Sequence, residues 1–136
     1  MPSAPKGPPP TMRTPKPVYD RMLGSMTGPH TRGHGDEITR FWYSRLRERG
    51  ATGRYVVISA GGIFSAEDAY RRIRLGASLV QVYTALIYRG PGLVKDIKRG
   101  LVRLLERDGY TSVAHAVGVD VAGAPAKTAT PETVAA

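Results

Sequence analysis

Two short loops hold the residues whose types and spacing could do chemistry. The adjacent glycines Gly61 and Gly62 follow an apolar run and precede an expected helix, and Tyr83 and Thr84 end the next apolar run. Glycines let main-chain N–H groups come close to an anion, and the helix N-terminus adds favourable electrostatics. These residues allow a phosphate site between two strand ends, with the Thr84 hydroxyl as a further donor. A tight strand-to-helix turn explains the glycine pair equally well, so both interpretations stay open.

Apolar patterning predicts the elements that would position these loops. Continuous apolar runs at 55–58 and 78–83 are typical of strands buried on both faces, and the helical segment between them makes the two strands parallel. The residues at 83–88 are expected to form the loop after the second strand. The fold class is therefore α/β, in the order helix 36–49, strand, helix 65–76, strand, a long helix from Pro91 to Gly109 and a last helical turn at 112–117.

Capping residues and apolar stripes set the expected helix ends and faces. Asp36 and Ser65 are good N-caps, and Asp68 completes a box-like start after Ser65. In the first helix the expected inward face is Ile38, Phe41, Trp42 and Leu46, and Trp42 with Phe41 and Tyr43 is expected to form core and rim rather than a base-stacking platform. In the long helix the apolar stripe is Leu93, Val94, Ile97, Leu101, Leu104 and Leu105.

Two strands alone leave open sheet edges. An exposed strand edge is a liability unless another strand pairs with it, so the pattern predicts a piece of a larger α/β fold or a chain that assembles with copies or partners. The segments 1–23, which is Pro-rich, and 121–136, rich in Ala, Thr and Pro, are expected to be disordered tails. Residues 24–120 would form a partly ordered or associating domain.

Composition excludes several classes of function. The chain has 136 residues and no cysteine, which excludes disulfides, iron–sulfur clusters and a cysteine nucleophile. Its 20 Lys+Arg against 11 Asp+Glu give a net charge of +9, but this charge is diffuse, and no nucleic-acid partner is expected. The start has no signal-peptide pattern, and no uncharged run is long enough to span a bilayer, so no membrane anchor is expected in this chain.

One set of residues resembles a known family. The runs Gly61-Gly62-Ile63, then 76–81 (GASLVQ), then Tyr83-Thr84-Ala85 and Gly90-Pro91 are similar to the C-terminal end of quinone-linked (class 2) dihydroorotate dehydrogenase. The loop 24–29 resembles the family's Gly-Gly-Leu-Ser-Gly-x-Pro loop, although Ser25 replaces the second glycine and Pro29 comes one place early. The resemblance implies that 24–120 is the C-terminal βαβα segment of a TIM (β/α)8 barrel, incomplete as a stand-alone chain.

The resemblance also implies a cofactor and partners. The family binds FMN, oxidises dihydroorotate to orotate in de novo pyrimidine (UMP) biosynthesis and passes the electrons to a membrane quinone. Gly28, Gly62, Tyr83 and Thr84 fall on positions that contact the flavin, chiefly around its phosphate, and Gly61 allows the close turn beside them. A Cβ at Gly62 is expected to block the approach of the main chain to that phosphate. Association with the bacterial or mitochondrial inner membrane is implied by the family alone.

No catalytic residue is assigned. The family's reaction needs a serine base, asparagines and a lysine around the substrate, but this chain has no asparagine, and Ser59, Ser65 and Ser78 stand at strand or cap positions. The chain is therefore expected to be inactive without the missing barrel portion or further copies. The alternative is a non-catalytic α/β fragment that oligomerises or binds a phosphate-bearing ligand.

The other polar clusters have structural interpretations. No metal site is expected, because Pro29, Gly33 and Gly35 argue against a helix that holds both His30 and His34, and His115 is far away in the sequence. Glu67 and Asp68 suit a helix N-terminus, and the basic face at 95–107 suits a solvated helix surface.

Overall fold

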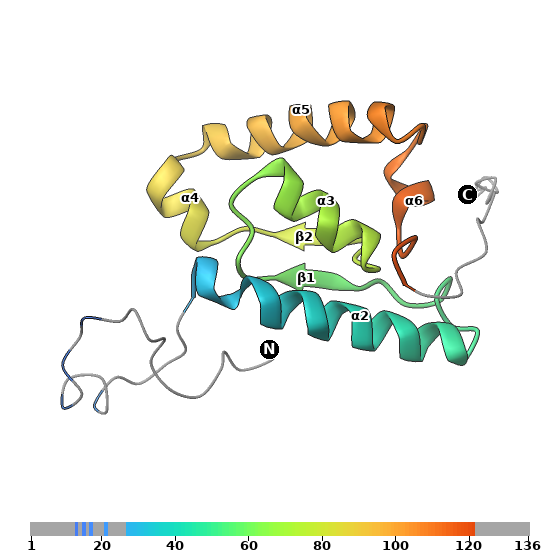
Figure 1. Cartoon of the computed structure of the whole chain (residues 1–136), viewed down its shortest axis with the longest axis horizontal. Helices are drawn as coiled ribbons and strands as arrows, with labels where there is room; N and C mark the ends of the chain where they lie inside the picture. Colours follow the sequence, from blue (N-terminus) through green and yellow to red (C-terminus); the bar gives the residue numbers. More distant parts are fainter. Residues whose placement is uncertain (1–12, 14, 16, 18–20, 22–26, 122–136) are drawn as a thin grey trace, which may run out of the picture.

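Two short parallel strands organise the part of the chain that the computed structural model describes, which is residues 13, 15, 17, 21 and 27–121. The strands pair in the register Ile58–Leu79, Ser59–Val80 and Ala60–Gln81 (Figure 1). In order, the elements are η1 (Pro29–Thr31), α2 (Arg32–Glu48), β1 (Ile58–Ala60), α3 (Ala66–Arg74), β2 (Leu79–Gln81), α4 (Thr84–Arg89), α5 (Gly92–Arg107) and α6 (Val113–Ala116). The parallel strand–helix–strand unit is confirmed; nearly all of the two predicted tails lies outside the described residues.

One face of the sheet is covered by helices and the other is exposed. Ser59 is buried and Val80 packs against the core, whereas Ile58 and Leu79 are 60% and 56% exposed. Successive strand residues point to opposite faces, so one face carries the helices and the other carries bare apolar side chains. The prediction of strands buried on both faces is therefore wrong for this chain, because the described residues supply no second layer.

The first strand begins later than predicted. Tyr55 and Val56 are exposed and lie before β1, although their apolar side chains suggested a strand. Ladder pairing needs a partner, and β2 offers one only from Leu79 onward. The main-chain N–H groups of Ser78 and Leu79 both donate to the carbonyl of Val57, which closes the start of the pair. The predicted loop at 83–88 is also corrected, since Thr84 begins the short helix α4.

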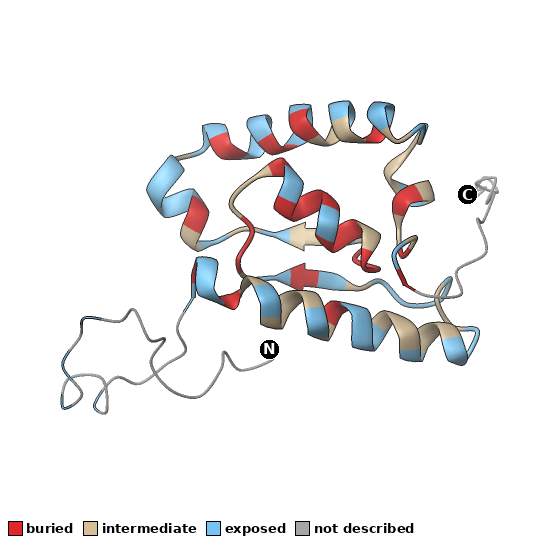
Figure 2. Ribbon diagram, viewed as in Figure 1, coloured by how far each residue is buried: buried red, intermediate tan, exposed pale blue. Residues whose placement is uncertain are grey.

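The core lies between α3 and α5. One buried cluster contains Ile63, Ala69, Ala85, Leu93 and Ile97, and a second contains Tyr70, Ile73, Leu105 and Ala116. Figure 2 shows the buried residues concentrated on α3 and on the side of α5 that faces it. Gly100 lets the two helices approach closely, because a Cβ there would collide with the Cβ of Ala66. The predicted stripe of α5 is confirmed except at Val94, which is exposed.

The start and the inward face of α2 differ from the prediction. The helix begins at Arg32, directly after the 3-10 turn at Pro29, and includes Gly33 and Gly35, which were expected to prevent it. The helix needs a glycine at position 35, because a Cβ there would collide with the guanidinium of Arg72. The predicted core pair Phe41 and Trp42 is 53% and 57% exposed.

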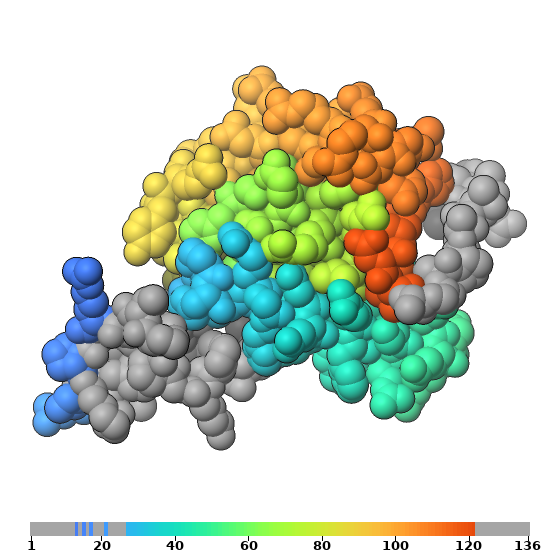
Figure 3. Space-filling model, viewed as in Figure 1, coloured from blue at the N-terminus to red at the C-terminus, as the bar shows by residue number. Residues whose placement is uncertain are grey.

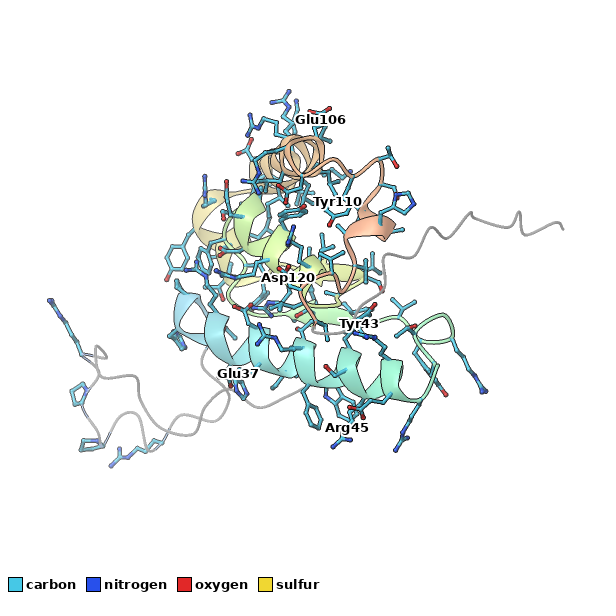
Figure 4. All side chains as sticks on the ribbon, turned by 45° about the vertical axis from the view of Figure 1, so that its right-hand side comes forward. Glu37, Tyr43, Arg45, Glu106, Tyr110 and Asp120 are labelled. Atoms are coloured by element: carbon cyan, nitrogen blue, oxygen red, sulfur yellow. The ribbon has the colours of Figure 1, made fainter. Side chains whose placement is uncertain are left out.

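Tyr43 and Thr39 form the inward face instead. The ring of Tyr43 lies against Gly76 and Gly118, where any Cβ would overlap it, and Figure 4 shows Tyr43 on the side of α2 opposite Glu37 and Arg45. The buried Thr39 hydroxyl lies 2.6 Å from the Ser59 hydroxyl. Apolar periodicity missed Thr39 because its polar side chain gave no apolar signal, whereas the predicted Ile38 and Leu46 are half-buried.

Ion pairs connect α3 to the segment 108–121, which follows α5. Arg74 lies 2.8 Å from a carboxylate oxygen of Asp108 and 2.6 Å from one of Asp120, and Tyr70 donates to Asp108 at 2.8 Å. Figure 3 shows this segment, in red, seated beside α3. Hydrogen bonds from Arg107 and from Tyr70 lower the pKa of Asp108 from 3.8 to about 2.

The inward face of α2 predicts a contrast between two aromatic residues. Tyr43→Ala removes a ring that fills the space over two glycines and should lower the free energy of unfolding by about 3 kcal/mol. Phe41→Ala, on the exposed face, should lower it by less than about 1 kcal/mol. Urea unfolding followed by circular dichroism measures both values. Equal losses would show that Tyr43 is not the inward anchor.

The Asp108 interactions predict acid sensitivity. A carboxylate with a lower pKa in the folded than in the unfolded state stabilises the fold above about pH 4 and loses that contribution as the pH falls toward 2. Asp108→Asn should therefore flatten the dependence of the urea midpoint on pH between 4 and 2. Asp96→Asn, at an exposed position of the same helix, is the matched control. An unchanged slope in Asp108→Asn would remove this residue from the acid response.

Candidate functional site

The carboxyl ends of the two strands bring two loops to one edge of the sheet. Ala60, the last residue of β1, is paired with Gln81, the last residue of β2. Because the strands are parallel, Gly61 and Gly62 leave this edge beside Tyr83 and Thr84, and Figure 1 shows both connections there. The register thus juxtaposes the two loops that the sequence singled out.

The loop after β1 has a main chain that favours glycine. Gly61 and Gly62 have φ angles of +91° and +72°, and Gly62 is buried. Within the described residues no acceptor takes the N–H of Gly62, Tyr83 or Thr84. A buried donor without a partner is costly, so an acceptor at this edge would stabilise it. Oxygen atoms of an anion are the natural acceptors for such main-chain donors.

A third loop adds Gly28 to the same edge. The Thr84 hydroxyl donates to the Thr27 hydroxyl at 2.7 Å, and a Cβ on Gly28 would lie 3.9 Å from the Thr84 methyl group. Gly28 is buried, has a φ of +134°, and its carbonyl accepts from both the N–H and the hydroxyl of Thr31. That hydroxyl lies 3.1 Å from the position of a Cβ on Gly61. All five predicted site residues therefore gather around one edge of the sheet.

Each site residue contributes main chain more than side chain. The three glycines and Tyr83 offer main-chain N–H groups. Tyr83 as a whole is 68% exposed. The Thr84 hydroxyl adds a side-chain donor on a short stem, and it can turn from Thr27 toward another acceptor. Such a set can hold a phosphate oxygen but offers no base or nucleophile.

Cationic side chains surround the loop after β1. Arg32 donates to the Gly62 carbonyl at 3.3 Å and forms an ion pair with Asp68 at 2.8 Å. Arg89 donates to the Phe64 carbonyl, and the Phe64 N–H donates to Asp68. Ser65 caps α3 by accepting from the Asp68 N–H, as predicted. These contacts hold the loop in place from outside, while the glycine N–H groups stay unengaged.

Sequence reasoning missed Arg72, which is 1% exposed and donates to the Gly61 carbonyl at 2.9 Å. A signal existed, because Arg72 lies among Ala69, Ile73 and Gly76 on the apolar face of its helix. Thr31 and Thr27, which join the Gly28 loop to the other two, carry no such signal.

Gly62 also has a packing role that the sequence did not predict, while the effect of a Cβ on phosphate binding stays a prediction. A Cβ there would meet main-chain atoms of Arg32 at 2.6 and 2.7 Å. The glycine is required because the first turn of α2 packs against it.

Two surface hollows, one at Ser44, Arg47, Glu48 and Val121 and one at the end of α5, share no residue with this edge. Among the described residues, no three His, Asp or Glu side chains could hold a metal ion together.

Comparisons with known proteins give one consistent result. The family model described as "Dihydroorotate dehydrogenase" matches residues 6–105, a range that begins upstream of residue 24. The chain is 58% identical over 69 residues to dihydroorotate dehydrogenase (quinone) of Nautilia profundicola, covering 51% of this chain and 19% of that protein. With the enzyme of the same name from Deinococcus radiodurans it shares 47% identity over 97 residues, covering 71% of this chain and 25% of that one.

The structural likeness agrees. The solved structure of ligand-free dihydroorotate dehydrogenase (DHODH) from Eimeria tenella superposes on this chain with a TM-score of 0.71 at 32% sequence identity. The superposition covers 86% of this chain and 30% of the Eimeria chain. The match spans about a fifth to a quarter of the length of the curated relatives above. The parallel pair with its helices is thus part of a TIM-type α/β barrel.

The packing of Gly62 predicts a stability effect. Gly62→Ala adds left-handed strain of about 1–2 kcal/mol and a collision with main chain that cannot move aside easily, so the loss of unfolding free energy should exceed 2 kcal/mol. Gly90→Ala is the matched control, because Gly90 has nearly the same φ, +70°, and open space around it. Its cost should stay near the strain alone. Similar losses in chemical denaturation would argue against the contact with Arg32.

Proposed function

Since this chain belongs to the dihydroorotate dehydrogenase family, we propose that it supplies the FMN-phosphate-binding segment of a dihydroorotate dehydrogenase (quinone). The reaction proposed for the complete barrel is the oxidation of dihydroorotate to orotate in pyrimidine biosynthesis, with a membrane quinone as electron acceptor. The role of Gly28, Gly61, Gly62, Tyr83 and Thr84 is to hold the phosphate end of the flavin.

One observation carries the proposal. The buried N–H of Gly62 and the N–H groups of Tyr83 and Thr84 have no acceptor in the described residues, and they lie at the ends of two adjacent parallel strands. The C-terminal face of a β/α barrel is where phosphate groups are commonly bound, between loops that follow neighbouring strands. Main-chain donors and a threonine hydroxyl suit a phosphate monoester, which has several oxygen acceptors and a net negative charge.

The residues of this chain would fix the flavin but not carry out the proton transfer. FMN, when bound, supplies the hydride acceptor; this chain holds its phosphate and thereby sets the position of the rest. Ser59 is buried in hydrogen bonds with Thr39 and Arg72, and Ser65 caps α3, so neither hydroxyl can act as a base on a substrate. The proton acceptor and the substrate ligands are therefore assigned to other strands of the barrel.

Quinone reduction and membrane association are part of the same proposal. They come from the family, and no helix among residues 27–121 is both long and apolar enough to cross a membrane. The proposed role of these site residues, chiefly at the flavin phosphate, is the same in membrane-associated and soluble barrels.

A second candidate is a non-catalytic α/β segment that oligomerises or binds another phosphate-bearing ligand. The observation in its favour is the bare sheet face, where Ile58 and Leu79 are paired in register and both are more than half exposed. In a complete barrel other strands would cover this face, and a further copy of the chain could cover it as well.

The test is a comparison of FMN with riboflavin, which lacks the phosphate. Titration of the full chain against each flavin, followed by flavin fluorescence, should give an affinity for FMN at least about tenfold higher. Thr84→Val should weaken FMN binding about tenfold because it removes a hydroxyl donor, and Thr84→Ser should keep it. Equal affinities for the two flavins would contradict the phosphate site. A colourless chain of defined oligomeric state in sedimentation would favour the second candidate.

A further inference from the structure

Arg72 is a buried cation whose hydrogen bonds meet at the candidate site. Its side chain is 1% exposed, and its guanidinium donates to the Ser59 hydroxyl at 2.8 Å, the Gly61 carbonyl at 2.9 Å and the Arg32 carbonyl at 3.2 Å. An ion pair with Asp36, at 2.8 Å between Nε and Oδ1, balances the charge. The proposed function gives this side chain no role, and an unpaired buried guanidinium would be costly, so its placement needs an explanation.

We propose that Arg72 is a positioning residue for the phosphate-binding loop, which rests on the proposed function above. The carbonyl of Gly61 and the N–H of Gly62 belong to the same peptide unit, and in a planar trans peptide they point in opposite directions. Arg72 draws the Gly61 carbonyl toward the helices. The N–H of Gly62 is therefore directed away from Arg72, which is the side of the peptide on which the proposal places the phosphate.

The contact matters because the residues on both sides of this peptide are glycines, which allow it more orientations than other residues would. Gly61 and Gly62 lack the Cβ atoms that restrict main-chain rotation, and both adopt positive φ. A charged donor on the carbonyl holds the peptide in one orientation and polarises it. This polarisation makes the N–H on the other side of the peptide a stronger hydrogen-bond donor. The guanidinium thus acts on an anion through one peptide unit, without touching it.

Arg72 also links the loop to the segment that carries Gly28. Its bond to the Arg32 carbonyl and its ion pair with Asp36 hold the first turn of α2. That turn continues from Thr31, whose N–H and hydroxyl donate to the Gly28 carbonyl. One side chain therefore sets the spacing between two of the three loops at this edge.

The hydrogen bonds around Arg72 leave one consistent arrangement. Thr39 has a single hydroxyl proton and donates it to the Gly35 carbonyl at 2.7 Å, so Ser59 must donate to Thr39 and accept from Arg72. A planar guanidinium can reach Ser59, Gly61, Arg32 and Asp36 together, whereas a lysine ammonium with three donors on a flexible stem cannot reproduce this fork.

The test compares Arg72→Lys with Arg71→Lys in the full chain. Arg71 forms ion pairs with the same Asp36 and with Asp68, but makes no bond to the main chain of the loop, so it is the matched control. Arg72→Lys should lower the ratio of FMN to riboflavin affinity about tenfold, and Arg71→Lys should leave it within about twofold. Equal weakening of both flavins by Arg72→Lys would indicate a merely structural role and overturn the proposal.

A second readout separates this proposal from the proposed function. In 15N–1H spectra of the flavin-free chain, Arg72→Lys should shift the Gly62 amide resonance, since the hydrogen bond to the carbonyl of its own peptide unit changes. Arg71→Lys should leave that resonance in place. If the wild-type chain binds no FMN but the Gly62 shift occurs, the flavin assignment fails and the positioning role stands. An unmoved Gly62 resonance overturns the positioning role.

A third variant covers the case in which Arg72→Lys does not fold, as judged by circular dichroism. Ser59→Ala removes one acceptor of the guanidinium and leaves the Gly61 carbonyl bond available. It should shift the Gly62 resonance and reduce the ratio of FMN to riboflavin affinity in the same direction, by a smaller factor. No change in either quantity would count against Arg72 as the group that orients this peptide.

Discussion

The in-register pairing of β1 with β2 is the constraint on which the rest of the structure depends. Because Ala60 and Gln81 end their strands side by side, the chain must leave the sheet at Gly61 and at Val82 along one edge. A slip of one strand by one residue would turn its inward residue, Ser59 or Val80, away from the helices and move Gly62 out of line with Thr84. The register therefore decides both which strand residues join the core and which loops meet at the candidate site.

A buried polar network holds this arrangement from the helical side. Thr39, Ser59 and Arg72 come from α2, β1 and α3, and their hydrogen bonds connect the three elements beneath the site. Polar groups at such depth are tolerated because the hydroxyls and the terminal guanidinium nitrogens are hydrogen-bonded and Arg72 Nε is ion-paired with Asp36. The same network that joins the layers also sets the peptide between Gly61 and Gly62, so the stability of the fold and the geometry of the site are coupled.

The bare face of the sheet agrees with membership of a barrel family. In a β/α barrel, alternate strand residues point inward and are covered by side chains from the other strands. Here Ile58, Ala60, Leu79 and Gln81 occupy those inward positions and are exposed. The chain matches about a fifth to a quarter of the length of these curated relatives, and its described residues supply two strands and their helices but no inward layer.

The sequence by itself determined the α/β class, the parallel strand–helix–strand order, the Ser65 cap and most of the apolar stripe of α5, since caps and periodic patterns depend on residues a few positions apart. It also singled out the glycine pair and Tyr83-Thr84, because they follow two apolar runs, and the resemblance to the family assigned them to FMN; their contact with FMN stays a prediction. The tertiary structure alone decided the inward face of α2, the shifted start of β1 and the place of Arg72. These depend on Thr39 meeting Ser59, on Tyr43 meeting Gly76 and Gly118, and on β2 supplying a pairing partner. Such contacts join residues far apart in the chain; helical periodicity places Arg72 on an apolar face but does not identify the groups that it meets there.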